Sequence, residues 1–166
     1  MIVGVPREAL LGSETGGFRR AMQSLDTGRI GIAAQAVGIA QAALDEAITY
    51  ARQRTAFGGP LSAIQAIQFM IADMSASVEA ARLLVRRAAW LRDRGESIVR
   101  AASEAKLVAA ETVVRVTSEA LQVHGAAGYS TEFPIERLYR DARVYPIFEG
   151  TSQIQRRIIA RELFRE

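Results

Sequence analysis

The sequence contains no cysteine and only one histidine, His124, among its 166 residues. The absence of cysteine excludes disulfide frameworks, thiolate metal sites and cysteine nucleophiles. A single histidine excludes a multi-histidine metal centre, and a serine triad would have to use His124 as its base. The chain must therefore fold on its apolar core and carry out any chemistry with other side chains.

Lysine is also scarce, because Lys106 is the only lysine among 21 basic residues, and the formal net charge is +3. Between residues 86 and 96 the arginines alternate with Asp93 and Glu96, which is typical of a solvated helix face. No basic stripe with interleaved aromatic residues, as nucleic-acid surfaces show, is present in this pattern. We therefore expect no nucleic-acid partner.

Long hydrophobic runs are missing too. No uninterrupted apolar run approaches the roughly 18 residues that a membrane span requires, and the first residues lack the basic-then-apolar layout of a secretory signal. Hydrophobic residues nevertheless make up 49% of the chain, which is enough to bury a core in a domain of this size. We expect a globular, cytoplasmic protein without a membrane span or a metal site.

Apolar residues recur at steps of three and four along most of the chain, which predicts amphipathic helices. Short glycine-rich or proline-containing loops separate them, so neighbouring helices should run in opposite directions. The pattern predicts an all-α fold, an up-and-down four-helix bundle with a short extra helix. The expected helices cover residues 18–54, 64–94, 98–123, 134–142 and 151–163.

Residues 1–16 differ from the rest of the chain. Ile2, Val3 and Val5 predict a short strand that ends at Pro6, and a turn-rich segment follows. We expect an extended lead-in over residues 1–16 and a helical domain over residues 17–166. Ser62 is positioned to cap the second long helix.

Small residues crowd the predicted helix seams, so the helices should pack too closely to hold a ligand between them. A ligand site is therefore expected at an end or on one face of the bundle. Arg29 interrupts the apolar stripe of the first helix. Burying its guanidinium costs free energy unless it is paired or faces a cleft, and Asp26 is one possible partner.

Glu149 is the strongest candidate for a catalytic base. It stands between an apolar run and a helix start, where Pro146 restricts the chain, Gly150 allows close approach, and Thr151 or Ser152 can cap the helix. The alternative is an acidic residue that merely suits the dipole of the following helix.

Other polar residues near helix ends have structural alternatives as well. Arg54 at a helix C-terminus can simply match the dipole, and Gln65 and Gln122 are typical of polar surface positions. His124, beside a glycine, can serve as a helix-end cap instead of a catalyst.

Several sequence motifs together resemble those of the C-terminal helical domain of the acyl-CoA dehydrogenases. The resemblance extends from Val5 to Leu163, and the motifs are highly specific when they occur in this order. The motifs are Gly17-Phe-Arg-Arg-Ala-Met22, Leu25-Asp-Thr-Gly-Arg29, Arg54-Thr-Ala-Phe-Gly-Gly-Pro60, Gln68-Phe-Met-Ile-Ala-Asp-Met74, Gly128-Tyr129, Glu136-Arg-Leu-Tyr-Arg-Asp141 and Phe148-Glu-Gly-Thr-Ser-Gln-Ile-Gln155.

The resemblance implies an FAD-dependent oxidoreductase of fatty acid β-oxidation, which converts an acyl-CoA thioester to the trans-2-enoyl product. Glu149 would remove the α-proton while the β-hydrogen leaves as hydride to the flavin. Some relatives place the base on the first long helix, at the position matching Gly28. Glycine at that position supports the assignment of Glu149.

The resemblance also implies binding residues. Those for acyl-CoA are Asp26, Thr27, Gly28, Arg29, Phe148 and Gly150. Those for FAD are Arg54, Phe57, Gln65, Gln122, Val123, His124, Gly125, Ala126, Thr151, Ser152 and Gln153, of which Arg54 and Gln65 match residues that reach the FAD of a neighbouring subunit. Two departures stand out, since the family usually has a glycine pair at Gly125-Ala126 and some relatives carry a hydroxyl at Ala56.

Complete members of this family carry an N-terminal helical domain and a middle β-domain, and residues 1–16 resemble the last strand and exit of that β-domain. We therefore expect a fragment or one piece of a split enzyme that binds FAD weakly by itself. The implied partners are the missing domains, further copies of the chain in a dimer or tetramer, and electron-transferring flavoprotein as acceptor. Two alternatives remain, a non-catalytic oligomerisation module and an acyl-CoA oxidase.

Overall fold

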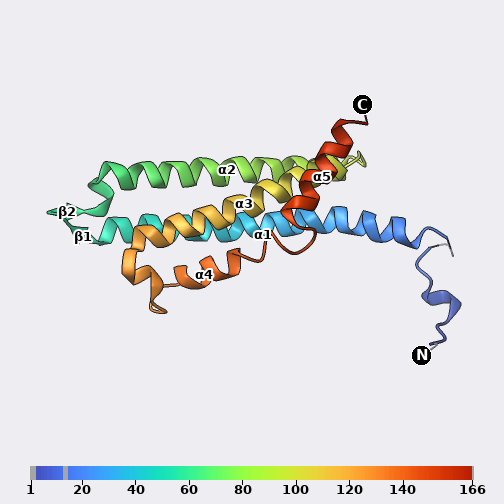
Figure 1. Ribbon diagram of the computed structural model, residues 1–166, viewed down its shortest axis with the longest axis horizontal. Helices are drawn as coiled ribbons and strands as arrows, with labels where there is room; N and C mark the ends of the chain where they lie inside the picture. Colours follow the sequence, from blue (N-terminus) through green and yellow to red (C-terminus); the bar gives the residue numbers. More distant parts are fainter. Residues whose placement is uncertain (1–2, 13–14, 166) are drawn as a thin grey trace.

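The computed structural model describes residues 3–12 and 15–165, and it is built almost entirely of α-helices (Figure 1). The all-α prediction is confirmed, and each predicted helix lies within a few residues of an observed one. The helices are α1 (Gly17–Gln53), α2 (Gln65–Asp93), α3 (Val99–His124), α4 (Ile135–Ala142) and α5 (Ser152–Leu163).

Helices α1, α2 and α3 lie side by side and alternate in direction, and α5 packs near the end where α2 turns into α3 (Figure 1). Helix α3 contacts α1, α2, α4 and α5, so it forms the centre of the bundle. Alanines such as Ala36, Ala47 and Ala105 are fully buried along these seams. Their small side chains let the helix backbones approach closely, as the sequence predicted.

Short elements connect the long helices. The β1 strand (Thr55–Ala56) pairs antiparallel with β2 (Gly59–Pro60) after α1, and the 3-10 helix η2 (Leu61–Ala63) leads into α2. A further 3-10 helix, η3 (Gly125–Tyr129), follows α3. The β1–β2 turn places Phe57 and Gly58 at positive φ, the geometry that suits a tight hairpin.

Two local predictions are wrong. Val3 and Val5 lie in irregular structure that leads to a 3-10 helix, η1 (Arg7–Ala9), because no strand among the described residues pairs with this segment; Ile2 lies outside the described residues. Ser62 does not cap α2, since the chain makes the η2 turn first and Ile64 occupies the N-cap position.

Candidate active site

Glu149 lies in a tight turn between α4 and α5. Its φ is 52° and that of Gly150 is 87°, so two consecutive residues adopt left-handed conformations. The turn is closed by Ser152 N, which donates to the Pro146 carbonyl oxygen at 3.0 Å. A positive φ is strained for a glutamate and marks positions that the surrounding structure holds in place.

Two fully buried side chains hold this turn. Lys106 Nζ, from α3, donates to the carbonyl oxygens of Tyr145 and Gly150, at 2.7 Å each. Gln155 Nε2, from α5, donates to Gly150 O at 3.0 Å and to Glu149 O at 3.3 Å. A Cβ at position 150 would lie 2.6 Å from Gln155 Nε2 and would be strained at the positive φ of this residue, so a larger residue there would displace the Gln155 amide from the turn.

Helix α5 begins directly after the turn. The Thr151 hydroxyl accepts a hydrogen bond from Ile154 N at 3.3 Å, so Thr151, one of the two predicted candidates, is the N-cap. The cap and the two buried side chains together fix the path of the chain on both sides of Glu149.

The Glu149 carboxylate points toward α1. A Cβ at position 28 would lie 3.2 Å from Glu149 Oε2, so the helix presents a glycine where the carboxylate comes closest. Oε2 is buried and has no hydrogen-bond partner among the described residues. The rings of Tyr145 and Phe148 meet edge to face beside the turn, with centroids 5.3 Å apart. A shielded carboxylate oxygen with free lone pairs is able to accept a proton from a bound molecule.

Further charged side chains are buried near this turn. Arg29 is buried, and its Nη1 lies 2.5 Å from Asp26 Oδ1, which confirms the predicted pair. Burial raises the pKa of Asp26 from its ordinary value, although the Arg29 charge opposes the shift. Burial also lowers the pKa of Lys106 to about 8; repulsion by Arg29 adds to this shift, and attraction by Glu149 opposes it. Arg29, Lys106 and Glu149 therefore form one interacting set of charges.

A second group of predicted residues gathers at the other end of α1. Arg54, Val123, His124, Gly125 and Ala126 line a hollow of about 320 Å³. Positions 28 and 54 are separated by about 40 Å of helix, at 1.5 Å per residue. The structure therefore places two separate groups of predicted residues in different regions of the domain.

His124 is the last residue of α3, and its ring is buried in this second region. Its Nδ1 donates to Ala120 O at 2.8 Å, and the ring stacks on Tyr50 with a centroid distance of 4.3 Å. Its Nε2 is buried and has no partner among the described residues. The ring is thus fixed by its own helix and by Tyr50, with one nitrogen unused.

The remaining predicted residues lie outside both groups or at their edges. Phe57, Gln65 and Gln122 are exposed to solvent, Phe57 almost completely. Ser152 and Gln153 line a surface hollow of about 640 Å³ between α3, α4 and α5, and the Ser152 hydroxyl is buried without a partner among the described residues. Thr27 lies on α1 between Asp26 and Gly28.

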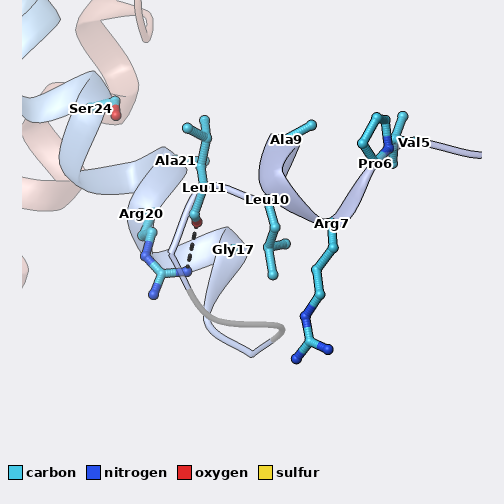
Figure 2. A pocket seen from close by; sticks show the side chains of 10 residues that line it. All are labelled: Val5, Pro6, Arg7, Ala9, Leu10, Leu11, Gly17, Arg20, Ala21 and Ser24. Atoms are coloured by element: carbon cyan, nitrogen blue, oxygen red, sulfur yellow. Dashed lines mark hydrogen bonds between the residues drawn. The ribbon is translucent and has the colours of Figure 1, made fainter.

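A further hollow is unrelated to these residues. It measures about 670 Å³ and forms where the lead-in segment lies against the start of α1, and a hydrogen bond from Arg20 Nη1 to Leu11 O links the two (Figure 2). None of the predicted site residues lines it. Elsewhere, the described residues contain no group of acidic or histidine side chains that could hold a metal, and none of their helices is long and apolar enough to cross a membrane.

Sequence reasoning missed Lys106 and Gln155. One available signal was that the only lysine of the chain falls within the apolar stripe of α3, between Ala102 and Ala109. Gln155 carried no comparable signal, because a glutamine on the first turns of a helix is usually a surface residue.

Comparisons with known proteins point to one family. Residues 15–164 match the family described as "Acyl-CoA dehydrogenase, C-terminal domain". The chain is similar to the short-chain specific acyl-CoA dehydrogenase of Bos taurus mitochondria, with 54% identity over 161 residues that cover 97% of this chain and 39% of that protein.

Solved structures give the same result. The structure described as "Three-dimensional structure of butyryl-CoA dehydrogenase from Megasphaera elsdenii" superposes with a TM-score of 0.95 and 48% identity, over 96% of this chain and 42% of that one. A chain from the structure described as "Electron transferring flavoprotein of Acidaminococcus fermentans" has a TM-score of 0.96 and 47% identity, over 98% of this chain and 43% of that one. The present chain thus spans about two fifths of the length of its relatives.

Proposed function

Because the chain belongs to the acyl-CoA dehydrogenase family, as its C-terminal domain, we propose that it supplies the catalytic base of an enzyme that oxidises acyl-CoA thioesters to trans-2-enoyl-CoA. One observation carries the proposal. Oε2 of the Glu149 carboxylate is buried, has no hydrogen-bond partner among the described residues, and faces a glycine of α1.

Glu149 is proposed to accept the α-proton of the acyl group. A carboxylate is a weak base toward a carbon acid, so the proton must be made more acidic by hydrogen bonds to the thioester carbonyl as negative charge develops there. The backbone N–H of Glu149 is a proposed donor for this oxygen. The aromatic rings of Tyr145 and Phe148 limit the access of water to the turn from one side.

Asp26, Thr27 and Arg29 are proposed to contact the CoA part of the substrate, and Phe148 and Gly150 its reacting end. The observed pair explains how α1 tolerates this polar segment, because Arg29 and Asp26 offset each other's charge. Arg29 Nε is buried without a partner among the described residues, so a donor is left for a bound group.

FAD is the proposed cofactor. The second region fits part of it, since Arg54 supplies a positive charge, His124 Nε2 is unused, and a Cβ at Gly125 would meet nothing within 4 Å. The unpartnered Ser152 hydroxyl at the start of α5 fits a polar group of the cofactor as well. The chemistry that FAD supplies when bound is acceptance of the β-hydrogen as hydride. The proposed binding residues are Arg54, Phe57, Gln65, Gln122, Val123, His124, Gly125, Ala126, Thr151, Ser152 and Gln153.

The proposed enzyme needs more than this domain. The middle β-domain of the family is proposed to hold the flavin ring. Self-association would bring the Arg54 region to the cofactor of a second copy. Electron-transferring flavoprotein is the proposed acceptor, an assignment that the similarity to a chain of the Acidaminococcus fermentans structure supports.

The test is Glu149→Gln in the flavin-loaded enzyme, followed by stopped-flow bleaching of the flavin band with a short acyl-CoA. We expect normal flavin content and a rate about 10² to 10⁴ times lower, the usual contribution of a general base. Glu132→Gln, at an exposed position before α4, is the control and should bleach at the wild-type rate. Bleaching of Glu149→Gln at that rate would refute the assignment.

The flavin-loaded wild-type enzyme also distinguishes the proposed dehydrogenase from the two alternative functions. Failure of the complete wild-type assembly to retain FAD would favour a non-catalytic oligomerisation module. Rapid reoxidation of the reduced flavin by oxygen, in preference to electron-transferring flavoprotein, would favour an acyl-CoA oxidase.

A further inference from the structure

The two side chains that hold the Glu149 turn are both polar and fully buried. Lys106 and Gln155 both donate to the same atom, Gly150 O. The second bond of Lys106 goes to Tyr145 O, and the second bond of Gln155 goes to Glu149 O. Three carbonyl oxygens of one short segment are thus held from α3 on one side and from α5 on the other.

Burial of an ammonium group in an alanine-rich bundle is costly, because the charge loses its hydration. Apolar side chains of similar length would pack in the same space without this cost. The hydrogen bonds found for Lys106 go to main-chain carbonyls and to no carboxylate. The benefit of the lysine must therefore lie in the segment whose carbonyls it orders.

That segment is strained where it carries the carboxylate. Glu149 has a φ of 52°, which a glutamate adopts only when its surroundings dictate it. Tyr145 O and Gly150 O lie on the two sides of Glu149 in the chain, so the bonds from Lys106 fix the span of the turn. The position of the carboxylate beside Gly28 follows from that span.

We propose that Lys106 and Gln155 are positioning residues, which together clamp the Glu149 turn in its left-handed conformation and thereby aim the carboxylate at the substrate. This inference rests on the proposed function, since it takes Glu149 as the base. It adds a role for two residues that touch neither substrate nor cofactor in that proposal.

The primary test compares Lys106→Met and Gln155→Leu in the flavin-loaded enzyme, because each removes one arm of the clamp and keeps a side chain of similar length. We expect the rate of flavin reduction per bound flavin to fall about 10- to 100-fold, since a misplacement of about 1 Å can cost 10²-fold in rate. The dissociation constant for acyl-CoA should change less than the rate, because neither side chain is proposed to contact the substrate directly.

Val116→Ala is the matched control. Val116 is fully buried on α3, so its truncation also weakens the core without removing a hydrogen bond from the turn. It should lower the melting temperature and leave the rate per bound flavin at the wild-type value. If Lys106 had only a structural role, Lys106→Met would likewise lower the melting temperature and leave the rate per bound flavin unchanged.

Amide hydrogen exchange on the flavin-free 166-residue chain gives a second readout that does not depend on turnover. Exchange across residues 145–155 should accelerate in both clamp variants and not in Val116→Ala. If Lys106→Met fails to fold, Gln155→Leu decides the outcome, because its two bonds end on the same turn.

A folded clamp variant that reduces flavin at the wild-type rate, with unchanged exchange in the turn, would overturn the inference. Glu149→Gln separates this failure from failure of the proposed function. If Glu149→Gln is inactive while the clamp variants are normal, the clamp alone is wrong; if Glu149→Gln is fully active, the base assignment falls and the clamp role with it.

Discussion

Replacement of Gly28 by alanine should stabilise the domain and slow the enzyme at the same time. Gly28 lies within α1, where glycine costs roughly 0.5–1 kcal/mol relative to alanine because it loses more backbone entropy. Gly28→Ala should therefore raise the free energy of unfolding by up to about 1 kcal/mol. The gain is reduced by whatever the new methyl group costs at the carboxylate.

The methyl group would lie 3.2 Å from Glu149 Oε2, which is closer than ordinary contact, so the carboxylate has to shift by a few tenths of an ångström. If 1 Å of misplacement costs about 10²-fold in rate, a shift of this size costs about three- to fivefold. The expected result is a more stable protein with a rate of flavin reduction about three- to fivefold lower.

Two other glycines of the same helix provide the control. A Cβ at Gly31 or Gly38 would meet nothing within 4 Å, so alanine there should give the stability gain without the loss of rate. Urea unfolding of the 166-residue chain measures the first quantity, and stopped-flow flavin reduction in the holoenzyme measures the second. Equal rates for Gly28→Ala and Gly31→Ala would refute the placement of the carboxylate against α1.

Three further outcomes follow from the charges of the site. Asp26→Asn leaves the buried guanidinium of Arg29 without its carboxylate and should lower the free energy of unfolding by about 3 kcal/mol in urea; a loss below about 1 kcal/mol would contradict a buried pair. In the folded chain the pKa of Lys106 is lowered from 10.5 to about 8. Between pH 8 and 10.5 the Lys106 amine is therefore protonated in the unfolded chain and mostly neutral in the folded one. Wild-type stability relative to Lys106→Met should thus rise between pH 8 and 10.5, and a flat difference would contradict the shift. Finally, the double variant Glu149→Gly with Gly28→Glu should reduce flavin about 10-fold faster than Glu149→Gly alone, since a side chain at position 28 starts beside the place of the Glu149 carboxylate. An equal rate for the single and the double variant would contradict the closeness of the two positions.

The helices could be predicted from the sequence because their apolar stripes are long and regular. The first helix was expected over residues 18–54 and is found at Gly17–Gln53, and the last was expected over residues 151–163 and is found at Ser152–Leu163. The capping signal and the strand signal gave wrong predictions, because the structure around each segment favours another conformation. Ser62 has the right chemistry for a cap but falls in a 3-10 turn, and the apolar residues before Pro6 have no strand to pair with among the described residues.

The candidate site was predictable only in part. Glu149 and Thr151, the N-cap of α5, belong to one local pattern, and Arg29 and Asp26 are separated by one helical turn. The clamp is different, because Lys106 bonds to carbonyls 39 and 44 residues further along the chain. Such contacts depend on how α3 packs against the turn, and no short sequence pattern encodes that packing. The positive φ of Glu149 also follows from this packing and not from a glycine or asparagine at its position.

The central claim is that Glu149 removes the α-proton of an acyl-CoA. The most direct measurement is incorporation of deuterium at the α-carbon of a bound acyl-CoA in D₂O, followed by mass spectrometry for wild-type and Glu149→Gln holoenzymes with equal flavin content. We predict α-deuteration by the wild type and a rate at least about 10²-fold lower for Glu149→Gln. α-Deuteration at the wild-type rate in the absence of the Glu149 carboxylate would contradict the assignment.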